Sequence, residues 1–107
     1  MKKTILFTFL IIISLNVYAQ GEPEKRASAL TETMTEALSL NTEEQSKVYQ
    51  IQLERFKQVA SIRSKYQNNQ EKRKAELKKV YNKLYGKLKG NLGEEKMLLW
   101  KEYKTNN

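Results

Sequence analysis

The sequence predicts an all-α fold: a short helix, then a long helical hairpin or one long rod, and a short C-terminal helix. One proline and four glycines in 107 residues leave too little turn-forming composition for an all-β chain. Apolar residues recur at steps of three and four along most of the chain, which is the period of one helix face. Polar stretches with capping residues separate these runs.

The first nineteen residues have the pattern of a cleaved signal peptide. Lys2 and Lys3 precede an apolar run over residues 5–15, and small or modest residues stand at the −3 and −1 positions before residue 20. The run is shorter than the roughly 20 residues that a membrane anchor needs, and the chain has no cysteine for a lipid anchor. We expect residues 1–19 to be removed and residues 20–107 to form a single domain in the periplasm.

The domain that remains is small and strongly basic. Residues 20–107 contain 18 basic and 12 acidic side chains, a net charge of +6, and 29 hydrophobic residues. A domain of this size usually needs disulfides, a metal or a partner subunit to be stable. The chain has no cysteine and no histidine, so we expect no metal or other cofactor and predict a homodimer.

The first helix is expected to begin near Pro23, a residue suited to the first helical turn. Its apolar face consists of Ala27, Leu30, Met34, Ala37 and Leu38. A second helix then begins within residues 40–45, where a capping box is expected. Asn41 with Glu44, or Thr42 with Gln45, has the required spacing, and the sequence does not decide between them.

The second and third helices carry apolar stripes that stay in phase across the polar residues 67–70. The stripes contain Val48, Ile51, Val59, Ile62 and Tyr66, with Phe56 beside them, and then Leu77, Val80, Tyr81, Leu84 and Leu88. This phase fits both a hairpin and a continuous rod. We favour the hairpin because it lets a small chain cover its own stripes. Gly90 and Gly93 are expected to end the third helix, and the last helix begins near Glu94.

Two segments resemble a known family signature. Residues 40–45 and residues 92–96 are similar to the L-T-x-x-Q motif that occurs twice in the Spy/CpxP family of small envelope-stress proteins. In the first copy Asn41 separates the leucine from the threonine, and in the second Gly93 and Lys96 replace threonine and glutamine. The motif residues, which we interpret as helix caps and helix-entry contacts, are Leu40, Asn41, Thr42, Gln45 and Leu92.

The resemblance implies a fold and a function. Members of this family form helical hairpins that pair as antiparallel dimers into a thin curved cradle. The cradle holds unfolded or partly folded envelope proteins without ATP, and some members instead bind the sensor domain of an envelope-stress kinase. Other members bind metal through histidine, but this chain has none, so that property does not carry over.

A chaperone needs adaptable apolar surface beside charge that attracts its clients. Residues 55–89 have a net charge of +10, and Arg55 and Arg73 fall within the apolar stripes. The residues that we predict to bind clients are Met34, Arg55, Phe56, Ile62, Arg63, Tyr66 and Arg73. In the alternative interpretation the apolar members are packing contacts, and the two arginines extend over apolar neighbours to solvent.

Other functions are less compatible with the residues present. The acidic pairs Glu43/Glu44 and Glu94/Glu95 lie at helix starts and point in different directions, and no histidine accompanies any serine, so we expect no enzyme. Export and the scatter of the basic residues around the helices argue against nucleic acid. Besides the kinase regulator, a protein that binds anionic lipid or the envelope surface is the remaining alternative.

Overall fold

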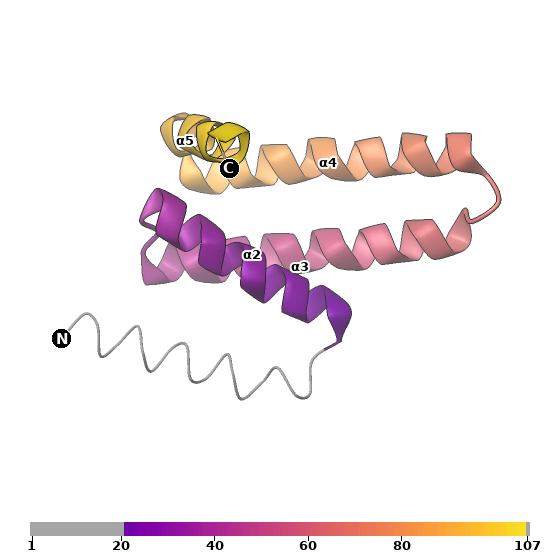
Figure 1. The fold of residues 1–107 in the computed structure, drawn as a ribbon, viewed down its shortest axis with the longest axis horizontal. Coiled ribbons are helices and arrows are strands. Elements are labelled where there is room, and N and C mark those ends of the chain that lie inside the picture. Colours follow the sequence, from indigo (N-terminus) through magenta and orange to yellow (C-terminus); the bar gives the residue numbers. More distant parts are fainter. Residues whose placement is uncertain (1–20, 107) are drawn as a thin grey trace.

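The computed structural model describes residues 21–106, which form four helices and no strand (Figure 1). The predicted all-α class is confirmed. The helices are α2 (Glu22–Leu38), α3 (Thr42–Lys65), α4 (Gln70–Leu92) and α5 (Glu94–Asn106). The predicted signal peptide, residues 1–19, lies outside the described residues.

The link between α2 and α3 shows which of the two predicted caps forms. The Glu44 backbone N–H donates to Asn41 Oδ1 at 2.8 Å, and the Asn41 N–H donates to Glu44 Oε1 at 3.0 Å. This reciprocal pair is a complete capping box. Thr42 is exposed in the first turn of α3, while the buried Gln45 donates through Nε2 to the Leu40 carbonyl at 3.1 Å. The Thr42–Gln45 alternative is therefore not the one that caps the helix.

Residues 66–69 separate α3 from α4, and the two helices lie side by side and antiparallel (Figure 1). Asn69 caps α4 by accepting a hydrogen bond from the Lys72 N–H at 3.0 Å. Farther along the pair, Lys87 Nζ lies 2.9 Å from Glu54 Oε2 and links the two helices.

A single residue joins α4 to α5. Gly93 has φ 89°, a backbone conformation that side chains with a Cβ rarely adopt, so glycine is suited to this sharp turn. Gly90 lies inside α4, and the expectation that it ends the helix is wrong. The helix continues to Leu92 because that residue is buried and packs in the core.

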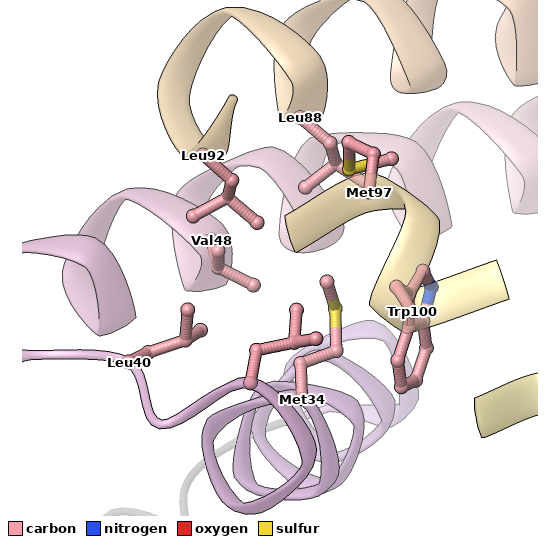
Figure 2. Packing of buried hydrophobic residues seen from close by; sticks show 8 residues of the cluster. Met34, Leu40, Val48, Leu88, Leu92, Met97 and Trp100 are labelled. Carbon is pink, nitrogen blue, oxygen red and sulfur yellow. The ribbon is translucent and has the colours of Figure 1, made fainter. Parts of the chain in front are cut away.

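The core lies at the end of the α3–α4 pair that is opposite the turn, and all four helices contribute to it (Figure 2). Its buried residues are Met34, Leu38, Leu40, Val48, Leu88, Leu92, Met97 and Trp100. All of them lie between residues 34 and 100, so residues 20–107 contain the whole of this core. Near the turn only two helices pack together, and the apolar side chains there are half-buried at most, as in Ile62, Tyr66 and Leu77.

Candidate functional site

An open groove forms where the N-terminal end of α2 crosses α3, with a volume of about 230 Å³. We call it the α2–α3 groove, and it is lined by Glu22, Pro23, Arg26, Phe56, Val59, Ala60 and Arg63. Phe56 and Val59 are half-buried and supply apolar surface. Arg26 pairs with Glu22 on its own helix at 3.4 Å, whereas Arg63 is exposed and has no carboxylate of residues 21–106 within ion-pair distance.

Arg55 lies beside this groove and contacts aromatic residues of two helices. Its Cζ is 4.3 Å from the centroid of the Phe56 ring and 5.5 Å from that of Tyr81 on α4. Nη1 donates to Gln52 Oε1 at 3.3 Å, while Nε is buried without a hydrogen-bond partner in the described part of the chain. A guanidinium over aromatic faces gains cation–π attraction. Arg55 therefore packs against rings, rather than only extending to solvent.

A second groove, of about 310 Å³, lies between α3 and α4. We call it the α3–α4 groove. Ile62 and Val80 provide its apolar surface. Lys79 and Lys83 also line it, together with Glu76, which pairs with Lys79 at 3.0 Å. Like the α2–α3 groove, it is lined by both apolar and charged side chains, but these come from a different pair of helices.

Two of the predicted client-binding residues have other roles in this structure. Met34 has no exposed surface, and the buried Gln52 donates through Nε2 to its sulfur at 3.6 Å. The prediction that Met34 binds clients is therefore wrong. The Met34 side chain faces the core because this side of α2 packs against α3. Arg73 donates through Nη1 to the carbonyls of Tyr66 and Gln67 at 3.3 and 3.2 Å, and thus holds the turn.

The remaining predicted residues fall into three places. Arg55, Phe56 and Arg63 lie at or beside the α2–α3 groove, and Ile62 lines the α3–α4 groove. Tyr66 lies at the C-terminal end of α3, where Lys65 Nζ is 5.4 Å from the centroid of its ring. The structure thus brings Arg55, Phe56 and Arg63 together. Met34 and Ile62 lie apart from this group, and Tyr66 and Arg73 contact each other at the turn.

The two motif copies lie together at the end of the α3–α4 pair that is opposite the turn. Leu40 and Leu92 belong to the same core cluster. Lys96 Nζ lies 2.9 and 2.8 Å from the two carboxylate oxygens of Glu44, and this contact joins the start of α5 to the start of α3. The hydrogen bond from Lys96, followed by that from the Asn41 backbone, holds the pKa of the Glu44 carboxyl below its ordinary value. Leu40 and Leu92 thus pack in the core, Asn41 caps α3, and Gln45 donates to the Leu40 carbonyl, whereas Thr42 is exposed.

Sequence reasoning missed several exposed apolar side chains. Tyr81 was expected in an apolar stripe but is exposed, and Leu98 and Leu99 of α5 are exposed as well, Leu98 by 58%. Tyr85 is also exposed, by 55%. In α5 the run of residues 97–100 covers every side of a helix, so only Met97 and Trp100 can face the core. A helical-wheel projection of that run would have signalled the exposure.

In the part of the chain that the structure describes, no three histidine, cysteine, aspartate or glutamate side chains gather as a metal site. None of the helices formed by residues 21–106 has the length and apolarity needed to span a membrane. No protein-family model matches the sequence, and no match is found among the curated proteins or the solved structures. The resemblance to the Spy/CpxP family accordingly rests on the two motif copies.

Proposed function

We propose that residues 20–107 form an exported, ATP-independent periplasmic chaperone that holds unfolded or partly folded envelope proteins. The observation that carries this proposal is the α2–α3 groove, where half-buried Phe56 and Val59 lie beside the unpaired cation of Arg63. Arg55, packed on the Phe56 ring, extends the same mixed character toward Tyr81.

The form of the groove suits many clients better than one ligand. Its volume of about 230 Å³ is below the usual range of small-molecule pockets. It is open and has room for one or two apolar side chains of an extended segment. The arginines add long-range attraction for acidic segments, which raises the rate of encounter at low salt. Such a surface holds its clients weakly and releases them without an energy source.

The resemblance to the Spy/CpxP family supplies the remaining parts of the proposal. In that arrangement α3 and α4 form the helical hairpin, and two chains pair as an antiparallel dimer. In this proposal residues 1–19 direct export and are then removed, which leaves the chain in the periplasm, where such clients occur. Regulation of a sensor kinase is the alternative within the same family.

The direct test is light scattering of a chemically denatured client that is diluted with or without residues 20–107. The groove variant Phe56→Ala/Arg63→Gln removes one apolar side chain and one cation. The control variant Leu98→Ala/Lys101→Gln makes the same two kinds of change on α5, where both residues are exposed. We expect the native chain to suppress aggregation, more strongly at low salt, and the groove variant to lose most of this effect.

The control variant should suppress aggregation as well as the native chain, and both variants should retain native helicity by circular dichroism. No suppression at a several-fold molar excess would contradict the chaperone function. Equal loss in the two variants would contradict the assignment to the α2–α3 groove. Tight binding to one folded sensor domain without any effect on generic clients would favour the regulator.

A further inference from the structure

The positive charge of the molecule is concentrated in one part of the fold. We define the tip as residues 57–79, the part of the α3–α4 pair around the turn. It contains two acidic residues and eight basic ones, which are Lys57, Arg63, Lys65, Lys72, Arg73, Lys74, Lys78 and Lys79. The net charge of the tip is +6, which equals the net charge of residues 21–106. The net charge of the rest of the described chain is therefore zero.

The cations outside the tip are mostly paired within the chain. Lys83 and Lys87 both reach Glu54, at 4.0 and 2.9 Å. Lys89 lies 3.8 Å from Glu94, and Lys47, Arg26 and Lys96 each have a glutamate partner as well. The other four cations outside the tip have no carboxylate of residues 21–106 within ion-pair distance, namely Lys25, Arg55, Lys101 and Lys104. Ten acidic side chains balance the ten basic ones in this part of the described chain.

The cations of the tip are mostly unpaired. Only Lys79 has an acidic partner, Glu76, at 3.0 Å, and Arg73 donates to the carbonyls of the turn. The other six have no carboxylate of residues 21–106 within ion-pair distance, and all six are exposed. Like charges crowded in this way repel one another, so this arrangement costs stability and suits a partner with dense negative charge.

The placement of these cations indicates the shape of the partner. Three of the six unpaired cations lie on α3 and three on α4, at spacings that place them on more than one side of each helix. They therefore do not present the single basic face that tracks a nucleic-acid backbone. A broad anionic surface can be approached by such a tip in many orientations. The large exposed apolar residues, Tyr81, Tyr85, Leu98, Leu99 and Tyr103, all lie outside the tip. A contact between the tip and such a surface would therefore be electrostatic, and it would not require apolar side chains to insert into an apolar layer.

We propose that the tip docks on a membrane surface through the phosphate headgroups of anionic phospholipids. Clusters of four to eight lysines or arginines bind anionic leaflets because each cation adds favourable electrostatic energy near the surface. The six unpaired cations of the tip fall within that range. This role differs from client binding in its partner and does not use Phe56, although Arg63 belongs both to the tip and to the α2–α3 groove. It places that groove close to a membrane.

The experiment is sedimentation of residues 20–107 with lipid vesicles, since the apolar run of residues 5–15 would itself insert. One set of vesicles is pure phosphatidylcholine, and the other also contains phosphatidylglycerol as the anionic lipid. The tip variant is Lys72→Gln/Lys74→Gln/Lys78→Gln. The matched control, Lys83→Gln/Lys87→Gln/Lys89→Gln, removes the same charge from the same helix at its other end.

We expect the native chain to sediment only with the anionic vesicles and to be released by salt. The tip variant should bind roughly tenfold more weakly or worse, and the control should stay within about threefold of the native chain. Equal weakening by both variants would overturn the assignment to the tip, and equal binding to both vesicle types would overturn the electrostatic contact. Tighter binding to a single-stranded oligonucleotide than to the vesicles would overturn the choice of partner. The aggregation assay contains no lipid, so its outcome stands apart from this one.

Discussion

At the scale of single residues, Glu44 takes part in both contacts that hold the start of α3. Its carboxylate completes the capping box with Asn41 and also pairs with Lys96 on α5. The Glu44 side chain is only 20% exposed and that of Lys96 30%, so solvent screens this pair less than the other ion pairs of the fold. One side chain thus fixes the start of α3 and its distance from α5.

The stability of the domain should depend on the protonation of Glu44. Its folded-state pKa lies below its ordinary value, so its contribution is present above the unfolded-state pKa and is lost as pH falls through the folded-state pKa. We expect the melting temperature to change little from neutral pH to about pH 5 and to fall below about pH 4.3, the usual glutamate value. Glu54 and Glu76 act in the same direction, because Lys87 and Lys79 lower their pKa values.

Glu44→Gln isolates the contribution of this residue, because glutamine can still accept from the Asn41 N–H but cannot form the ion pair. The variant should melt at a lower temperature at neutral pH and show a shallower decline in acid. Glu43→Gln, at an exposed neighbouring position, is the control and should follow the native curve. A Glu44→Gln profile parallel to that of the native chain would show that the pair does not contribute.

At the scale of helices, α5 is the element held by the fewest buried side chains. Met97 and Trp100 are buried, while Leu98 and Leu99 point away from the core. Figure 2 shows Met97 and Trp100 reaching from α5 toward the side chains of the other helices. The attachment of α5 therefore depends on these two residues, on the contact of Lys96 with Glu44 and on the turn at Gly93.

Trp100→Ala should destabilise the domain by about 3–5 kcal/mol, because it removes a large buried side chain and leaves a cavity. Leu99→Ala, at an exposed position on the same helix, should cost less than about 0.5 kcal/mol. Urea unfolding followed by far-UV circular dichroism measures both free energies. If Leu99→Ala were as costly as Trp100→Ala, the exposed side of α5 would be covered by another surface in solution.

At the scale of the whole molecule, the core is small and lies at one end. Eight buried apolar residues form the main cluster, and the turn end of the α3–α4 pair has only those two helices to cover apolar side chains such as Tyr66 and Leu77. The chain has no cysteine or histidine with which to supplement this core. Large apolar side chains remain exposed on α4 and α5. These features favour association of two copies.

Sedimentation equilibrium of residues 20–107 at micromolar concentration should therefore give twice the mass of one chain. Burial of the exposed tyrosines of α4, Tyr81 and Tyr85, would supply the hydrophobic free energy for this association. The melting temperature should then rise with protein concentration, as it does for linked folding and association. A monomer that melts sharply at a temperature independent of concentration would contradict the dimer.

Much of the local structure was readable from the sequence. The three- and four-residue apolar period predicted helices, and the capping residues marked where α3 begins. Both signals are local, because they depend on side chains within one or two turns of each other. These local signals do not indicate which side of an apolar stripe another helix will cover. For this reason neither the full burial of Met34 nor the exposure of Tyr81 was predicted from the sequence.

The sequence by itself determined the helical class, the capping signals, the lack of histidine and cysteine and the excess of positive charge. Only the tertiary structure decided that Met34 is core, that Arg73 holds the turn and that Glu44 meets Lys96 52 positions away. It also decided which cations are neutralised and which remain unpaired at the tip. The physical reason is range: helix formation depends on neighbours in sequence, whereas burial and ion pairing depend on side chains that folding brings together.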